Sequence, residues 1–462
     1  MTPPTHPQPE QPDVVASIRD DLADWRQWLG RFVVLLFAVL AGVSVVAFTW
    51  LCERALNGFV ALRTFHAWWP FIWTPLCLGA LVWLTRRYAP GAAGSGIPQV
   101  MAALDPTVDE QDRRLFVSLR LSAAKAVLTA GGLMAGLATG REGPSVQIAA
   151  GVMQHARRWL PKGAPVSNHG LLTAGGAAGI AAAFNAPLAG VMFAIEELSR
   201  RIEQRNSGLI ISAIVLAGLM AVSAFGNSTY FGVIRVPPLE PGFLFPALLV
   251  TLASGVLGGL FSRLLHASLV GTPDRFSRWR KDHPVAFAAA CGLAIALIGW
   301  VSGGASFGSG YDYTRRLLEG QTDMPLLYVT LRFVATWLAA WSGVPGGIFA
   351  PSLAIGAGIG ADVALLTGWT ASSSALIALG MAGFLAAVTQ APLTAFIIVM
   401  EMVDGHAMVL SLMAAALGAK LVSRWISQPL YSTLMLAQLA RLQPILTPQS
   451  KAMGSADERP IS

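Results

Sequence analysis

The segment Gly140-Arg141-Glu142-Gly143-Pro144 breaks a stretch that is otherwise apolar enough to span a membrane. Proline lacks a backbone N–H and has a fixed φ, so it suits the first turn of a helix and disrupts the middle of one. The segment therefore predicts a helix that begins at about Pro144, inside the membrane. The first N–H groups of such a helix have no intrahelical partner, and its dipole is positive there, which makes an anion site. Glu142 is an anion already tethered beside that site.

Composition places the rest of the chain in a membrane as well. Of its 462 residues, 54% are hydrophobic and 12% are charged, about half of the ~25% charged content of a globular protein. Its three cysteines form no Cys-x-x-Cys pair and its seven histidines form no His-Glu-x-x-His motif, so we expect no metal site, no cofactor and no enzymatic activity. The net charge of +7 fits positive loops that orient a membrane protein, rather than a nucleic-acid partner.

Apolar runs predict the spans, and their order divides the chain into four regions. Residues 1–30 form a cytoplasmic N-terminal segment, in which residues 13–31 have the apolar spacing of an amphipathic helix. Residues 31–205 form a first transmembrane repeat, residues 206–440 a second, and residues 441–462 a short polar cytoplasmic tail; only such a tail is expected after Tyr431. The predicted spans are 32–50, 69–84, 121–137, 209–225, 244–261, 285–301, 326–341, 348–366, 375–399 and 409–425. The apolar run 171–195 is predicted to be broken at Asn185-Ala186-Pro187, and residues 105–114 and 274–283 are predicted polar loops.

Two motifs recur at nearly one spacing, which indicates an internal duplication. The segment 140–151 matches the segment 347–358 at Gly, Pro, Ser, Ile and Gly, 207 positions apart, and Ala-Pro-Leu at 186–188 recurs at 391–393, 205 positions apart. Glu196 repeats as Glu401 at the second spacing, so we interpret this pair as structural. Broken segments at corresponding places in two halves point to the central site of a transporter.

The halves differ where chemistry is expected. Glu142 corresponds to Phe349, and Glu197 corresponds to Met402. Both glutamates lie in or beside predicted spans, where ionisable side chains are functional by default. They are therefore candidate functional residues on the repeat alone.

These motifs resemble the CLC family of chloride channels and proton-coupled chloride antiporters, over about residues 30–440. The similar segments are Gly94-Ser95-Gly96-Ile97-Pro98, Gly140 to Pro144, Gly347-Ile348-Phe349-Ala350-Pro351 and the late tyrosine Tyr431. The resemblance implies an all-α polytopic membrane protein built from two inverted-topology repeats of tilted and broken helices. It also implies a homodimer with a pore in each subunit. We expect none of the paired regulatory modules that many members carry after the last helix.

The resemblance also implies roles for single residues. Ser95, Tyr431 and the backbone N–H groups of Ile348 and Phe349 would bind chloride; Glu142 would be the external gating glutamate, and Glu197 the internal proton-transfer glutamate of the family's antiporters. The glycine and proline residues of the three loops would shape the pore: Gly94, Gly96, Ile97, Pro98, Gly140, Arg141, Gly143, Pro144 and Gly347. Ser95 is typical of chloride-preferring members.

Each candidate residue also has a simpler structural role as an alternative. Glu142 would stabilise its helix by about 0.3–1 kcal/mol, Glu197 would be a solvated helix end, Ser95 a turn residue and Tyr431 an interfacial tyrosine. Lys125 either adds positive potential to the pore or extends its ammonium to an interface. Arg141 is interpreted as a brace for its loop.

Together with these motifs, the resemblance implies a secondary active transporter that exchanges chloride for protons. The alternative is a passive chloride channel of the same fold, gated by voltage or pH. Chloride, protons and the lipid bilayer are the expected partners, together with a second copy of the chain. The expected location is a bacterial inner membrane, with both termini cytoplasmic.

Overall fold

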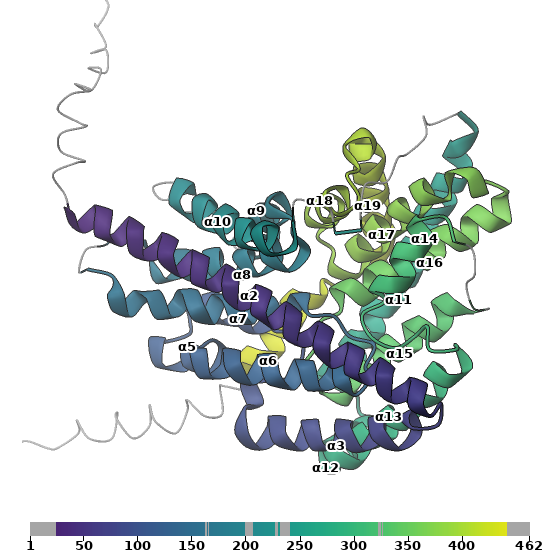
Figure 1. Cartoon of the computed structure of the whole chain (residues 1–462), viewed down its shortest axis with the longest axis horizontal. Coiled ribbons are helices and arrows are strands. Elements are labelled where there is room, and N and C mark those ends of the chain that lie inside the picture. Colours follow the sequence, from purple (N-terminus) through teal and green to yellow (C-terminus); the bar gives the residue numbers. More distant parts are fainter. Residues whose placement is uncertain are drawn as a thin grey trace, which may run out of the picture.

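The computed structural model is a bundle of helices and broken helices (Figure 1). It describes residues 25–161, 164, 166–198, 207–226, 230–231, 241–321, 325 and 327–440. Seven helical segments in this part of the chain are long and apolar enough to cross a membrane. The expected all-α polytopic class is therefore confirmed for these residues, in which the one extended pairing is a bridge between Gly140 and Gly347.

The helices alternate between long spans and short, interrupted pieces. In chain order the α-helices are α2 (Trp25–Phe65), α3 (Pro70–Tyr88), α4 (Ile97–Leu104), α5 (Glu110–Phe116), α6 (Leu119–Met134), α7 (Glu142–His155), α8 (Asn168–Phe184), α9 (Pro187–Phe193), α10 (Ser207–Phe225), α11 (Leu244–Val270), α12 (Arg275–Asp282), α13 (Pro284–Val301), α14 (Tyr311–Leu318), α15 (Tyr328–Ser342), α16 (Phe349–Thr367), α17 (Ser373–Thr389), α18 (Pro392–Met402) and α19 (Val409–Arg424). A π-helical turn, Ala194–Leu198, continues α9, and a last helix covers Leu430–Ala440.

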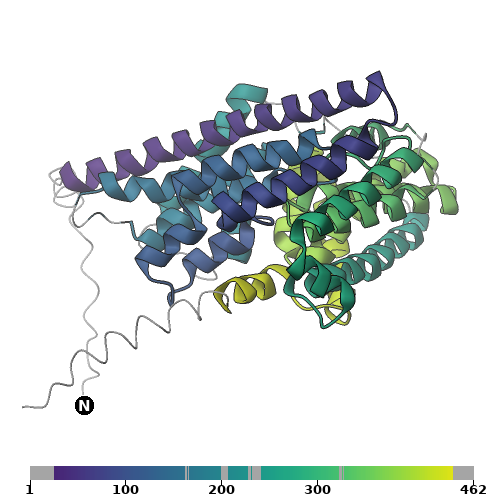
Figure 2. The same ribbon diagram turned by 90° about the horizontal axis from the view of Figure 1, so that it is seen from below.

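The two halves of the chain repeat one plan. Helices α7 and α16 begin 207 positions apart, and α8 and α17 begin and end 205 positions apart. Each of the latter two ends at a left-handed non-glycine residue, Asn185 or Gln390. In Figures 1 and 2 the blue helices of the first half and the green helices of the second lie largely side by side. The boundaries proposed from sequence, 31–205 and 206–440, remain a prediction.

Several predicted spans need correction. The run 375–399 is not one span, because α17 ends at Thr389 and Pro392 opens a new helix, α18. The first span is longer than residues 32–50: α2 has 41 residues and begins at Trp25. Residues 25–31, expected in a separate amphipathic helix, are the first turns of α2, and the rest of that predicted helix lies outside the described residues, as does the tail 441–462.

Both predicted polar loops contain a helix. Within 105–114, α5 begins at Glu110, and within 274–283, α12 begins after Asp274, whose side chain accepts a hydrogen bond from the backbone N–H of Ser277 at 2.8 Å. An aspartate in this position is a capping signal, which the abundance of charged residues obscured. The helix α14 was not predicted, and the chain after Tyr431 continues as a helix to Ala440 rather than as a polar tail.

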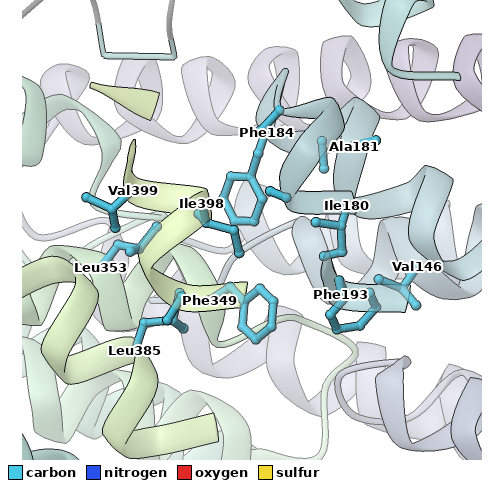
Figure 3. Packing of buried hydrophobic residues seen from close by; sticks show 14 of the residues in the cluster. Val146, Ile180, Ala181, Phe184, Phe193, Phe349, Leu353, Leu385, Ile398 and Val399 are labelled. Atoms are coloured by element: carbon cyan, nitrogen blue, oxygen red, sulfur yellow. The ribbon is translucent and has the colours of Figure 1, made fainter. Parts of the chain in front are cut away.

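Aromatic packing joins the halves at their centre (Figure 3). The ring of Phe349, at the start of α16, stacks on Phe184 from α8 and meets Phe193 from α9 edge-on, with 6.3 Å between ring centroids in each case. Such aromatic pairs stabilise the fold by more than the burial of their apolar surface alone. They fix the start of α16 against α8 and α9.

Candidate functional site

The starts of α7 and α16 are joined backbone to backbone. Gly140 and Gly347 exchange two hydrogen bonds, each of 2.8 Å, in an antiparallel bridge. The Thr139 hydroxyl adds a bond of 3.0 Å to the carbonyl oxygen of Gly347. Because Gly140 and Gly347 are equivalent residues of the repeat, this reciprocal pairing is what a local two-fold axis between the halves requires. It brings two helix N-termini together in the middle of the molecule.

Glu142 lies in the gap between these two helix starts. Its side chain is buried, and its Oε2 accepts a hydrogen bond from the backbone N–H of Ala350, in the first turn of α16, at 3.4 Å. Its Oε1 is buried without a hydrogen bond partner in the described structure. The carboxylate of one half therefore occupies the positive end of a helix of the other half.

Helix α7 begins earlier than predicted. α7 begins at Glu142 instead of at about Pro144, with Arg141 as its N-cap residue. Pro144 is thus the third residue of the first turn. Backbone N–H groups in this turn have no acceptor within the helix, so the N–H that proline lacks costs the helix no hydrogen bond. Glu142 is in consequence the first helical residue, and its carboxylate cannot lie far from the turn that carries the positive end of the dipole.

The Ser95 loop completes the site from a third element. Gly94 and Gly96 have φ of +76° and +108°, which favour glycine, and α4 begins directly after them, at Ile97. The backbone N–H of Gly346 donates to the carbonyl oxygen of Gly94 at 3.1 Å. A Cβ placed on Gly143 would lie 2.9 Å from the carbonyl oxygen of Ser95. The loops 94–98, 140–144 and 346–351 therefore meet at one point.

Ser95 and Tyr431 line one cavity of about 100 Å³, which we call the Ser95 cavity. Ile348, the N-cap residue of α16, lines it as well. Both hydroxyl oxygens are buried, and the Ser95 side chain lies close to the Tyr431 hydroxyl. The Tyr431 ring packs edge-on against Phe349, with 6.0 Å between the ring centroids. Two buried hydroxyl groups beside a helix start suit an anion that must bind and also leave.

Glu197 lies in the π-helical turn Ala194–Leu198 and is half-buried. Tyr431 is within electrostatic range of both Glu197 and Glu142. The second half has no π-turn at the corresponding place, since α18 continues as an α-helix to Met402. The residue that breaks the repeat therefore lies where the backbone also departs from it, and π-turns occur often at functional sites.

Glu196 and Glu401 each cap the N-terminus of a helix in the other half of the chain. The Glu196 carboxylate accepts from the backbone N–H groups of Leu393 and Thr394 at 3.2 and 2.7 Å, at the start of α18. The Glu401 carboxylate accepts from Leu188 and Ala189 at 3.1 and 2.7 Å, at the start of α9. This matches the structural interpretation of the pair, and it adds a second reciprocal contact across the same local two-fold axis.

Lys125 is fully buried, so its ammonium does not extend to an interface. It donates to the carbonyl oxygens of Ala92 and Gly94 at 2.8 and 2.6 Å. Arg141 pairs with Glu53 of α2 at 2.9 Å and donates to the Tyr230 hydroxyl at 3.4 Å. Arg141 thus ties its loop to α2, as expected of a brace.

The comparisons with known proteins agree with this geometry. A model of the voltage gated chloride channel family matches residues 76–424. The H(+)/Cl(-) exchange transporter ClcA of Cronobacter sakazakii is 32% identical over an alignment of 450 residues, which covers 90% of this chain and 93% of that protein. The chain belongs to the voltage gated chloride channel (CLC) family. Among the residues described, it contains no cluster of side chains suited to a metal ion.

Solved structures show the same fold for this CLC chain. A slow cyanobacterial Cl⁻/H⁺ antiporter aligns with a TM-score of 0.78 at 24% identity, over 90% of this chain and 99% of that one. A eukaryotic CLC transporter aligns with a TM-score of 0.71 at 22% identity, over 89% of this chain and 74% of that one. The expected CLC-type architecture is therefore confirmed.

The sequence did not predict a second cavity, of about 400 Å³, which Arg141 lines in this CLC chain. We call it the Arg141 cavity; its polar lining residues include Glu53, Tyr230, Ser309 and Asp312. A signal was present in the sequence, because Gly308-Ser309-Gly310 repeats Gly94-Ser95-Gly96 at a spacing of 214. The helices that follow, α4 and α14, also begin 214 positions apart.

One hydrolase-like pattern, Gly-x-Ser-x-Gly, occurs at residues 304–308. Its serine, Ser306, is buried and shares a hydrogen bond of 2.9 Å with the hydroxyl of Ser302. A nucleophilic serine needs a general base as its partner, and another hydroxyl does not serve as one. The pattern here belongs to the loop between α13 and α14.

Proposed function

We propose that this chain is a secondary active transporter that exchanges chloride for protons across a membrane. The observation that carries the proposal is the place of the Glu142 carboxylate, buried between two helix starts and in contact with the N–H of Ala350. A carboxylate resembles chloride at a helix N-terminus, since both are anions that accept hydrogen bonds. Protonation removes its charge and its attraction to that place, so proton binding and chloride binding compete.

The roles of the other residues follow from this position. Ser95 and Tyr431 would donate their hydroxyl groups to chloride, and the backbone N–H groups of Ile348 and Phe349 would complete its shell. Glu142 would be the external gating and proton-accepting residue, and Glu197 would pass protons on the internal side. The similar ClcA is a H(+)/Cl(-) exchange transporter, which favours exchange over a passive channel.

The assembly and location are proposed on the same basis. We expect a homodimer in a bacterial inner membrane, with each subunit holding its own site and with both termini cytoplasmic. Exposed leucines on α9, α18 and α19, such as Leu188, Leu393 and Leu410, would face lipid or the second subunit. Chemical cross-linking in membranes would test the dimer, and modification of cysteines introduced near each terminus would test the orientation.

The test of function is proton uptake into chloride-loaded proteoliposomes, driven only by an outward chloride gradient. Uphill proton movement, with a fixed ratio to chloride, is the expected result. Chloride flux without proton movement would show a channel or an uncoupled carrier instead. Absence of both fluxes in well-folded protein would reject the site.

A further inference from the structure

Four successive carbonyl oxygens before Ser95 are each held by a donor. Those of Gly91 and Ala93 accept from the side-chain amides of Gln147, at 3.0 Å, and of Gln99, respectively. Those of Ala92 and Gly94 accept from the Lys125 ammonium, and Gly94 accepts from the N–H of Gly346 as well. The whole Gly91–Gly94 segment is therefore fixed by its oxygen atoms.

These contacts matter for an anion. A carbonyl oxygen carries partial negative charge, and in a buried cavity such a charge acts strongly because the local dielectric is low. One carbonyl turned toward the Ser95 cavity would repel chloride at the place where the Ser95 hydroxyl attracts it. The donors around the segment keep its oxygens engaged, so the hydroxyl remains the polar group that the loop offers to the cavity.

The second half shows which of these donors belongs to the shared scaffold. Arg332 stands 207 positions after Lys125 and is likewise fully buried. Its guanidinium donates to the carbonyl oxygens of Phe307 and Gly308 at 3.2 and 2.7 Å, in the loop that repeats Gly94-Ser-Gly96. A buried cation that holds a loop by its carbonyls is thus common to both halves.

Gln147 is where the halves differ. Its counterpart, 207 positions later, is Ala354, which has no side-chain donor. Gln147 is fully buried on α7, five positions after Glu142, and donates to the carbonyl oxygens of Gly91 and Phe116 at 3.0 and 2.7 Å. The first half therefore has a link that Ala354 cannot make, and this link joins the helix of Glu142 to Gly91, four residues before Ser95.

We propose that Gln147 is a specificity-determining positioning residue, which holds the Gly91–Gly94 segment before Ser95 so that its carbonyl oxygens stay out of the anion cavity, and which couples that segment to α7. The inference rests on the proposed chloride site and names a residue that supports it. Both acceptors of Gln147 are carbonyl oxygens, so only the NH₂ end of the amide can serve both of them. No other neutral side chain of this length offers two such donors.

The experiment is chloride binding by titration calorimetry on purified protein, with Gln147→Met beside wild type. Methionine keeps the length and the approximate volume but donates no hydrogen bond. We expect chloride affinity to fall about tenfold, as for a buried acceptor left without its donor. Thiocyanate, which is larger and spreads its charge, should lose less, so the chloride-to-thiocyanate affinity ratio should fall. A general loss of packing would lower both affinities alike.

The matched control is Gln154→Met, which removes the same side chain from the same helix, seven positions further on. It should leave both affinities at the wild-type values. If Gln147→Met is folded, by its thermal unfolding midpoint, and binds chloride as wild type does, the proposal is wrong. An equal drop in Gln154→Met would also overturn it.

If Gln147→Met does not fold, Gln147→Asn replaces it. The shorter amide still donates but cannot reach both carbonyl oxygens, so we expect a two- to fivefold loss of chloride affinity, about half the effect of losing both bonds. Wild-type affinity in Gln147→Asn would contradict the proposal. If the wild-type protein itself binds no chloride, the proposed function is wrong. This result differs from wild-type chloride affinity in the variants, which contradicts only the role of Gln147.

Discussion

The loops before α4 and α14 share one backbone and differ in what surrounds them. In each, a Gly-Ser-Gly sequence has two glycines with positive φ, +76° and +108° at Gly94 and Gly96, and +67° and +90° at Gly308 and Gly310. Each is held by a buried cation, Lys125 or Arg332. The backbone alone therefore does not decide which loop binds an ion.

The two loops differ in the side chains around them. The second residue of α4 is Pro98, whereas that of α14 is Asp312, so α14 carries its own carboxylate at its positive end. The Arg141 cavity is lined by Glu53 and Asp312 as well as by Arg141, while the residues that line the Ser95 cavity include no acid. The comparison teaches that the two halves hold equivalent helix starts, and that a few side chains leave an acid beside one of them and none in the lining of the other, where we propose that chloride binds.

The largest effect is expected from Glu142→Gln, which removes the charge that distinguishes α7 from α16. Without a titratable group between the helix starts, chloride should still pass but no longer in exchange for protons. Chloride flux and proton uptake in proteoliposomes measure the two separately. Intact proton coupling in this variant would show that another group carries the proton.

A second comparison is Lys125→Met against Arg332→Met. Each substitution leaves buried carbonyl oxygens without donors, so each should lower the free energy of unfolding by about 2–4 kcal/mol. Chemical unfolding in detergent micelles measures this. Only Lys125→Met should also weaken chloride binding, because only its loop carries the Ser95 hydroxyl. Equal chloride affinities in the two variants would argue that the loops are interchangeable.

The two capping glutamates, Glu196 and Glu401, are expected to contribute equally to the free energy of unfolding. Glu196→Ala and Glu401→Ala each remove a carboxylate from the start of a helix in the other half, so each should lower the free energy of unfolding by about 1–2 kcal/mol. The same unfolding experiment applies. A loss confined to one variant would mean that the reciprocal caps do not contribute equally.

The smallest effect concerns the serines themselves. Ser95→Ala should reduce chloride affinity about fivefold, the value of one neutral hydrogen bond of about 1 kcal/mol. Ser309→Ala should leave it unchanged, because Ser309 lines the Arg141 cavity and accepts from the N–H of Tyr311 at 3.4 Å. Calorimetry on the two proteins decides between these outcomes.

Much of the site could be predicted because its loops carry unusual residues at membrane depth. Gly94, Gly140 and Gly347 marked three turns, and proline residues marked the helix starts behind them. The internal repeat alone identified Glu142 and Glu197 as departures from symmetry. The run 375–399 shows the limit of hydropathy, since its apolar content hid the break before Pro392 that the repeat had already indicated.

The sequence by itself determined the class of protein, the starts of its broken helices and the positions at which its halves differ, because these follow from local residue types and spacing. Tertiary structure decided which helix starts meet. The bridge between Gly140 and Gly347, the contact of Glu142 with Ala350 and the crossed caps of Glu196 and Glu401 all join residues about two hundred positions apart. The packing of one half against the other places them together, and no local pattern encodes that arrangement.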